Sequence, residues 1–253
     1  MNIIILYSSF LKENDLERLG IKYFLKLGMN VKILNLTRLV NKEYYFKSTN
    51  KINISNEIFI KNFNQFEREL IDNCNSKHII ISFIHLNYKT YKFFEIISKY
   101  NLVYVKSLIN IIPDLNFRKK SLLKKLLNLR AKNILFIFKN YYFKFFKFKK
   151  LRLKSPNYII LSGSYGLKHP QYKISDKNTK HIWAHSFDYD NFLNVNKYYI
   201  NSRKSDYAVF YDSPYPLFKN DIFIEGIENK LTIEKFYPSI CNFFSYIENN
   251  FNI

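Results

Sequence analysis

Two short segments hold most of the side chains in this chain that could do chemistry. Residues 181–193 read HIWAHSFDYDNFL, and residues 204–223 read KSDYAVFYDSPYPLFKNDIF. In each segment a short apolar run ends in carboxylates and turn-forming residues. Polar groups just past the carboxyl end of a strand form the usual ligand crevice of open α/β sheets. These two segments therefore hold the first candidate functional residues.

The first segment offers a candidate catalytic group of one histidine and two carboxylates. His185 lies three residues before Asp188 and five before Asp190. Histidine changes charge near neutral pH, so His185 is a candidate general base toward an acceptor hydroxyl. The carboxylates would bind sugar hydroxyls or a cation, although Asp190 is equally suited to cap a helix. A histidine bonded to a loop carbonyl is the simpler alternative. Two carboxylates without a third ligand do not predict a metal site.

Two further strand ends supply candidate substrate-binding residues. Asp212 ends the run YAVFYD, and its carboxylate either faces the crevice or starts the proline-containing turn that follows. The stretch LSGSYGLKHP (161–170) is another strand-to-loop junction, where glycine lets the backbone approach a phosphate closely. An ordinary turn is the alternative, since a single GxxG is weak evidence. The candidates there are Gly163, Ser164, Lys168 and His169. The histidines beside other strands, such as His85, are expected to satisfy local bonds only.

The elements that must position these residues alternate between strand and helix. Apolar runs typical of buried parallel strands occupy 2–8, 31–36, 78–85, 102–108, 157–163, 181–186 and 207–212. Helical spacing is found over 13–28 with Gly28 as a C-cap, over 58–74, over 88–100, and over 233–251 with Pro238 near its first turn. The pattern predicts an α/β fold with a Rossmann-like, doubly wound, mostly parallel sheet. Residues 7–13 contain neither GxGxxG nor a Walker sequence, so no dinucleotide or P-loop site is expected there.

Composition restricts the class of partner. The formal net charge is +20 over 253 residues, which implies an anionic partner: nucleic acid, an anionic membrane surface or a phosphorylated substrate. The two cysteines, Cys74 and Cys241, form no CxxC pattern and are expected to be buried thiols of a reduced, cytoplasmic protein. No apolar run approaches the roughly 18 residues of a membrane span.

One segment concentrates the positive charge. Residues 118–154 contain 14 Lys or Arg and no Asp or Glu, with leucines and then phenylalanines between them. A helix with a cationic face and an apolar face suits an anionic membrane interface, where each basic residue adds roughly 1 kcal/mol of attraction. A solvated helix packed on the sheet is one alternative. Nucleic-acid binding is less favoured, because Lys outnumbers Arg and no RRM or KH pattern is present. The candidate membrane-binding residues are Lys119, Lys120, Lys124, Lys125, Arg130, Lys144 and Lys147.

The segments HSFDYDNFL and YAVFYDSPYPLFKND resemble a bacterial family of glycosyltransferases of GT-B type that build surface polysaccharide or lipopolysaccharide. The segment FYPSICNFFSYIE (236–248) resembles the helix that leads into the family's second Rossmann-like half. Phe192 replaces the usual tyrosine, and Pro-Leu-Phe-Lys replaces a Pro-His-Pro-like turn. The positions that match the family are His185, Asp188, Tyr189, Asp190, Leu193, Phe210, Asp212, Pro216 and Asp221.

The resemblance implies the N-terminal, acceptor-side half of such an enzyme. Residues 1–232 would form the Rossmann-like domain with segment 118–154 inserted, and 233–253 a helix leading toward a C-terminal domain that the chain lacks. That C-terminal half carries most sugar-nucleotide contacts in GT-B enzymes, so activity of this chain alone is left open, and a separate polypeptide is a candidate partner. The implied reaction transfers a sugar from a nucleotide-sugar to a lipid-linked or glycan acceptor, without a cofactor, at the inner face of the cytoplasmic membrane. The alternatives are a non-catalytic homologue that binds membrane or a partner through its basic face, and a nucleic-acid-binding α/β protein.

Overall fold

The structure, a computed structural model, describes residues 2–47, 54, 56–72, 78–109, 138–139, 142–143, 151, 153–185, 189, 193 and 232–251. The chain divides into two compact units, Met1–Asn194 and Val195–Ile253, which are described separately. Several predicted features lie outside the described residues: the strand at 207–212, and the candidate residues Asp188, Asp190, Asp212, Lys119, Lys120, Lys124, Lys125, Arg130, Lys144 and Lys147.

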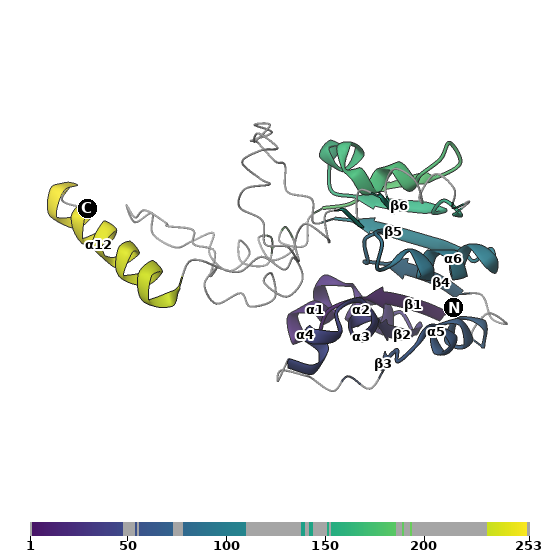
Figure 1. The fold of residues 1–253 in the computed structure, drawn as a ribbon. Coiled ribbons are helices and arrows are strands. Elements are labelled where there is room, and N and C mark those ends of the chain that lie inside the picture. The colour runs from purple at the N-terminus through teal and green to yellow at the C-terminus, as the bar shows by residue number, and fades with distance from the viewer. Residues whose placement is uncertain are drawn as a thin grey trace. The chain divides into compact units, whose positions relative to one another are not determined.

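The first unit is built on a parallel sheet (Figure 1). Its described strands are β1 (Asn2–Tyr7), β2 (Asn30–Asn35), β3 (Glu57–Phe59), β4 (His78–Ser82), β5 (Tyr104–Leu108), β6 (Tyr158–Leu161) and β7 (Lys180–Trp183). The order across the sheet is β3-β2-β1-β4-β5-β6-β7, and every pair is parallel. The order reverses between β1 and β4, which is the topological switch point of a doubly wound sheet. This arrangement confirms the predicted α/β, Rossmann-like fold class.

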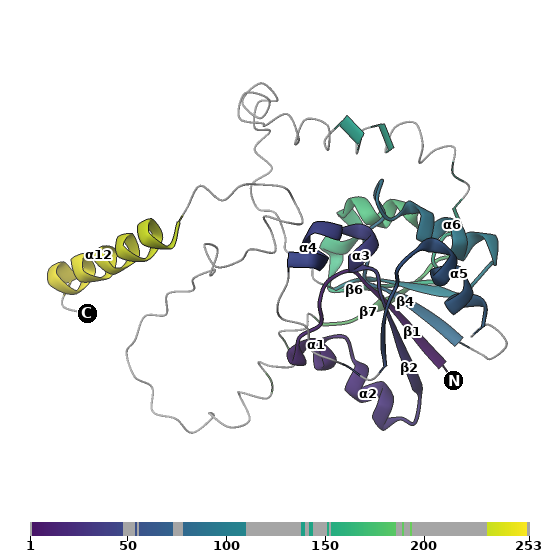
Figure 2. The same cartoon turned by 60° about the horizontal axis from the view of Figure 1, so that its bottom comes forward.

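Helices cover both faces of this sheet (Figure 2). The short helices α1 (Glu13–Arg18) and α2 (Ile21–Lys26) pack against the face that carries Ile3, Ile5 and Val31. Helices α5 (Phe63–Ile71) and α6 (Tyr91–Lys99) pack against the other face. The other helices that the structure describes in this unit are α3 (Thr37–Val40), α4 (Lys42–Lys47), η2 (Ser164–Lys168) and η3 (Pro170–Ile174).

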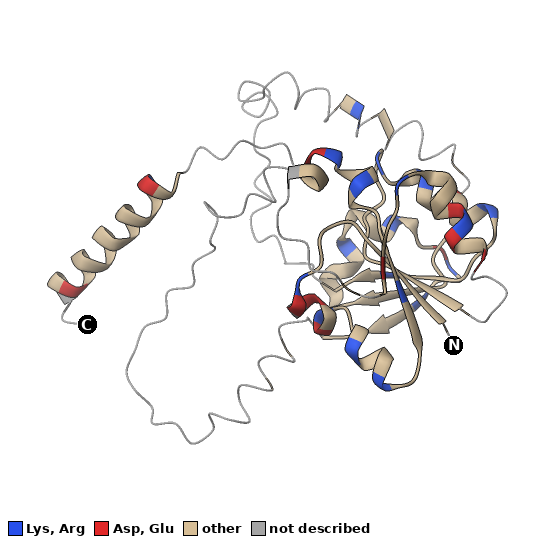
Figure 3. Ribbon diagram, turned by 90° about the horizontal axis from the view of Figure 1, so that it is seen from below, with Lys and Arg blue, Asp and Glu red and all other residues tan. Residues whose placement is uncertain are grey.

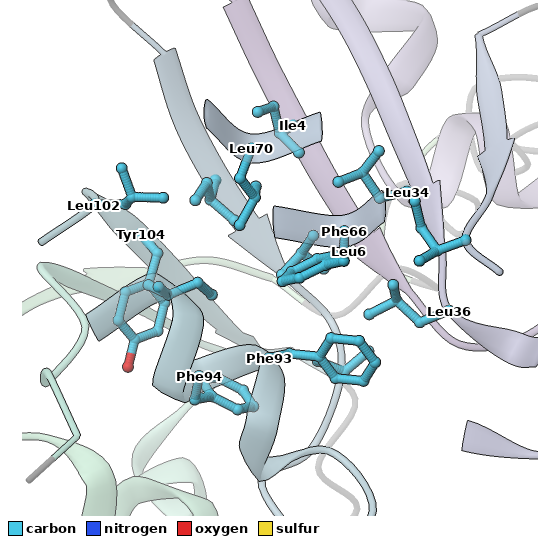
Figure 4. Packing of buried hydrophobic residues seen from close by; sticks show 14 of the residues in the cluster. Ile4, Leu6, Leu34, Leu36, Phe66, Leu70, Phe93, Phe94, Leu102 and Tyr104 are labelled. Atoms are coloured by element: carbon cyan, nitrogen blue, oxygen red, sulfur yellow. The ribbon is translucent and has the colours of Figure 1, made fainter. Parts of the chain in front are cut away.

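Strand residues that point to either face of the sheet are apolar because helices cover both faces. The larger core cluster lies on the face covered by α5 and α6. Phe66, Phe93 and Phe94 from α5 and α6 are fully buried against Leu6 of β1 and Tyr104 of β5 (Figure 4). Burying one such side chain contributes about 1.5–3 kcal/mol relative to leaving it in water. The charged residues of this unit lie mainly on helices and connecting segments (Figure 3). The strands are therefore fixed by apolar packing, and the polar groups at their carboxyl ends are held on a rigid frame.

The predicted helix over 13–28 is interrupted. Gly20 has a φ of 72°, in the left-handed region that favours glycine, and it separates α1 from α2. The expected C-cap at Gly28 is confirmed: its φ is 69°, its N–H bonds to Leu25 O at 3.0 Å, and Met29 N bonds to Phe24 O at 3.1 Å. These two bonds form a Schellman motif, which satisfies carbonyls at the end of α2.

The predicted helix over 58–74 is wrong at its start. Residues 57–59 form β3 and pair with β2, with Ile33 opposite Glu57 and Asn35 opposite Phe59. The helix begins at Phe63, after Asn62 caps it by accepting a hydrogen bond from Gln65 N at 2.8 Å. In this stretch, pairing with the edge of β2 outweighs the helical spacing of the local sequence.

The described part of the second unit is helix α12 (Ile233–Phe251). Pro238 lies inside the helix, at its sixth residue, near the first turn. Cys241 is exposed, contrary to the expectation of a buried thiol, and Cys74 lies outside the described residues. In the described parts of the chain, no helix is both long and apolar enough to cross a bilayer.

Candidate functional site at the carboxyl edge of the sheet

The loops that follow β4 and β6 meet at the carboxyl edge of the sheet. The side chain of Gln171, in η3, holds both backbone groups of Leu86: its Oε1 accepts from Leu86 N at 2.6 Å, and its Nε2 donates to Leu86 O at 2.9 Å. The hydroxyl of Thr90 donates to the carbonyl of His85, which fixes the same loop from the side of α6. Two segments distant in sequence are thus joined above the ends of the strands.

A lysine lies buried beneath these loops. Lys106 is the third residue of β5, in register with Ser82 of β4 and Ile159 of β6. Its side chain is fully buried, and its Nζ donates to the carbonyl of Ile84. Burial lowers the pKa of Lys106 to about 7. Among the described residues, Lys106 forms no salt bridge, and the buried hydroxyl of Ser82 has no hydrogen-bond partner.

Two histidines lie close to this ammonium group. The rings of His85 and His169 have centroids 5.8 Å apart. Desolvation, followed by the positive charge of Lys106, lowers the pKa of His169. Desolvation, followed by the positive charges of Lys106 and His169, lowers the pKa of His85 to about 4, although the residue as a whole is exposed. We call Ser82, His85, Lys106 and His169 the Lys106 cluster.

The tautomer of His169 follows from its place at the start of η3. Its Nδ1 accepts a hydrogen bond from Gln171 N at 3.2 Å, as the N-cap of that helix. A neutral imidazole that accepts at Nδ1 carries its proton on Nε2. His169 therefore presents an N–H donor on the side of the ring that faces away from the cap.

A second polar group joins the carboxyl ends of β1 and β2 to the first residue of β3. Asn35 is fully buried, and its Nδ2 donates to Ser9 O at 2.8 Å and to Glu57 Oε1 at 2.5 Å. Its Oδ1 accepts from Thr37 N at 2.9 Å. Burial raises the pKa of Glu57, and the hydrogen bond from Asn35 opposes this rise. Asn35 thus joins three segments and keeps a half-buried carboxylate at the edge of the sheet.

The four candidate residues after β6 have different environments. Gly163 has φ 93° and ψ 172°, a conformation that essentially only glycine adopts. Ser164 is exposed, and Lys168 lies over the ring of Tyr165 with its Nζ 5.2 Å from the centroid. Of the four, His169 belongs to the Lys106 cluster.

The candidate catalytic histidine His185 lies two residues past the end of β7. Its imidazole is exposed and stacks on Tyr189, with centroids 4.3 Å apart and an interplanar angle of 29°. His185 therefore lies at the carboxyl edge, as predicted for a residue just past a strand. Its predicted partners Asp188 and Asp190 are outside the described residues.

Sequence reasoning missed His85 and Lys106 as members of a site. One signal was present for Lys106: a lysine inside the apolar run LVYVKSL, where charged residues are almost never fully buried unless paired. Nothing in the local sequence links His85 to His169. Across the residues that the structure describes, no group of three His, Cys, Asp or Glu side chains is placed to hold a metal ion.

No protein-family model, no curated protein and no solved structure matches this chain.

Proposed function

We propose that this chain is the acceptor-side domain of a glycosyltransferase of bacterial surface-polysaccharide biosynthesis. The reaction is the transfer of a sugar from a nucleotide-sugar to a hydroxyl of a lipid-linked or glycan acceptor. The sequence resemblance of residues 185–193 and 207–221 suggests this class, and the doubly wound parallel sheet agrees with the fold that it implies.

One observation carries the proposal: His85, His169 and His185 follow the carboxyl ends of β4, β6 and β7 of a single parallel sheet. In such sheets ligands bind outside the carboxyl ends of the strands, near the switch point. Three side chains that exchange protons or donate hydrogen bonds therefore lie along the edge where a sugar acceptor would bind.

In the proposed reaction the acceptor oxygen attacks the anomeric carbon, and the bond from that carbon to the nucleotide oxygen breaks. The departing nucleotide keeps the electron pair, and a base on the protein takes the proton of the acceptor hydroxyl. We assign that base to His185, whose exposed ring is held by Tyr189. Asp188, Asp190 and Asp212 are assigned to the sugar hydroxyls on the sequence pattern alone.

The test is a transfer assay with a panel of radiolabelled nucleotide-sugars and lipid-linked acceptors. His185→Gln should lower the rate by about 10²–10⁴-fold, the usual effect of removing a general base. The matched control is His78→Gln, because His78 begins β4 and so lies at the amino edge of the sheet. The assay is repeated with neighbouring-gene products added. Absence of transfer and of nucleotide-sugar binding under both conditions would remove the proposal.

We also propose that segment 118–154 holds the protein at an anionic membrane surface. The support is its charge, 14 basic and no acidic residues, within a chain of net charge +20. Vesicles containing phosphatidylglycerol should sediment the protein at low salt and release it at high salt, because such attraction is screened. Neutral vesicles are the control. An oligonucleotide that displaces the protein from vesicles would favour nucleic acid instead.

A further inference from the structure

We propose that His85 and His169, with Lys106 beneath them, form a binding site for the diphosphate group of the substrate. The inference rests on the proposed function only in naming a phosphate-bearing sugar carrier as the source of that group. The site itself consists of three basic side chains that lie close together.

The arrangement places two histidines at the surface and a buried basic group below them. The two imidazoles are the members that reach solvent, and their centroids are 5.8 Å apart. Lys106 is fully buried and donates to the Ile84 carbonyl, in the residue before His85. The imidazoles would therefore contact the anion, while the ammonium group would act on it through space.

The charged neighbours of the site are all basic in the described part of the chain. The charges that affect His85 come from Lys106 in β5 and from His169 between η2 and η3, and those that affect His169 come from Lys106. No carboxylate is among them. Lys168, which precedes His169, adds another positive charge to the same loop. Among the described residues no negative charge balances these groups, so a negatively charged ligand would complement them.

The energetic cost of the arrangement also points to a ligand. A buried ammonium group without a counter-ion is destabilising, because its hydration is lost without a compensating charge. The buried Ser82 hydroxyl beside it has no partner among the described residues. Groups whose protonation is suppressed by burial and by each other recover protons when an anion arrives. Diphosphate binding should therefore be accompanied by proton uptake.

The loops are fixed before any ligand binds. Gln171 joins Leu86 to η3, and Nδ1 of His169 is used in the cap, so Nε2 is left as a donor. A phosphate group accepts several hydrogen bonds, and it is attracted to a compact positive charge such as an ammonium group. A single carboxylate offers less charge for three basic groups, so it is the weaker candidate.

The experiment measures binding of inorganic pyrophosphate by calorimetry to the full chain at several pH values, in two buffers of different ionisation enthalpy. We expect proton uptake on binding, and affinity that falls as the pH rises from 6 to 8.5. His85→Gln combined with His169→Asn should weaken binding at least tenfold. Asn keeps an acceptor near the position of Nδ1, so the cap of η3 is retained. His78→Gln is the matched control and should bind as the wild type does.

Three outcomes would overturn the inference: no pyrophosphate binding at millimolar concentration, equal binding by the double variant, or tighter binding of glucuronate than of pyrophosphate. Uridine diphosphate and farnesyl diphosphate identify the source of the group. Tighter binding of the first supports a nucleotide donor, and tighter binding of the second supports a lipid carrier. Lys106→Met should weaken binding and lower the proton uptake, with circular dichroism as a check on folding. Pyrophosphate binding without any sugar transfer would sustain this site while removing the proposed function.

Discussion

Gln171 and Leu86 form a paired contact across 85 residues of sequence, in which one side-chain amide satisfies both backbone groups of a buried residue. The contact resembles the pair of backbone hydrogen bonds that two residues exchange between neighbouring strands. It fixes the loop after β4 against the loop after β6, and these are the two loops that supply His85 and His169. The position of the Lys106 cluster therefore depends on a residue that is not a member of it.

We predict that Gln171→Ala lowers stability by about 1–3 kcal/mol, because two buried backbone groups of Leu86 lose their partner. For a chain of this size that corresponds to a melting temperature lower by about 2–4 °C per kcal/mol. Thermal unfolding followed by circular dichroism measures it. The control is Gln65→Ala, since Gln65 accepts from Lys61 N in an exposed setting. Equal losses in both variants would contradict the role given to Gln171.

Most of the fold could be predicted from the sequence, because continuous apolar runs such as NIIILY and HIIIS leave few alternatives to buried parallel strands. Strand β3 could not, since its three residues become a strand only through pairing with β2. The carboxyl edge was predicted as the place of the site, and His169 and His185 were predicted there. The approach of His169 to His85 depends on the contact between Gln171 and Leu86, which no local spacing encodes.

Lys106 should make stability depend on pH. An unfolded lysine has a pKa of about 10.4, whereas burial lowers the pKa of Lys106 to about 7 in the folded protein. Between these values the unfolded chain binds a proton that the folded protein does not, so stability rises with pH by at most about 1.4 kcal/mol per unit. At pH values below about 7 both states are protonated and the full cost of burying the charge is present.

The corresponding variant is Lys106→Met, which cannot titrate. Relative to this variant, the wild type should gain stability as the pH rises from 7 to 9.5, measured as free energies of unfolding in urea. Lys89→Met is a graded comparison, because partial burial lowers the pKa of Lys89 in the same direction. Parallel pH curves for the wild type and Lys106→Met would show that the ammonium group is not buried as described.

Any substitution at Gly163 should lower the stability of the protein, because only glycine readily adopts its backbone conformation. Its φ of 93° and ψ of 172° lie in a region that is essentially restricted to glycine. A Cβ at this position would meet no atom within 4 Å, so a steric clash is not involved. We expect Gly163→Ala to cost about 1–3 kcal/mol in urea unfolding. Gly28→Ala is the comparison with equally open surroundings but an ordinary left-handed φ of 69°, and it should cost less. A larger loss at Gly28 would contradict this account.

Asn35→Asp should place two carboxylates against each other. The Nδ2 of Asn35 donates to Glu57 Oε1 at 2.5 Å and to Ser9 O, and a second carboxylate has only acceptors to offer there. We expect a loss of about 3–5 kcal/mol at pH 7, the usual effect of an uncompensated buried charge. Urea unfolding measures it, with Asn62→Asp as the control. That substitution keeps the acceptor for Gln65 N and adds charge at a helix N-terminus, where it is tolerated.

The pH dependence of this variant has a definite sign. Burial raises the pKa of Glu57 above its ordinary value, so the folded protein binds more protons than the unfolded chain in the acid range. The stability linked to Glu57 is fully present below the ordinary carboxyl pKa of about 4.3 and is lost as the pH rises through the raised value. A neighbouring carboxylate raises that pKa further, because two close negative charges oppose each other. The deficit of Asn35→Asp relative to the wild type should therefore be small near pH 4 and grow toward pH 7. A deficit that stays constant over this range would mean that Asn35 acts only through Ser9 and Thr37, and that Glu57 does not feel the new charge.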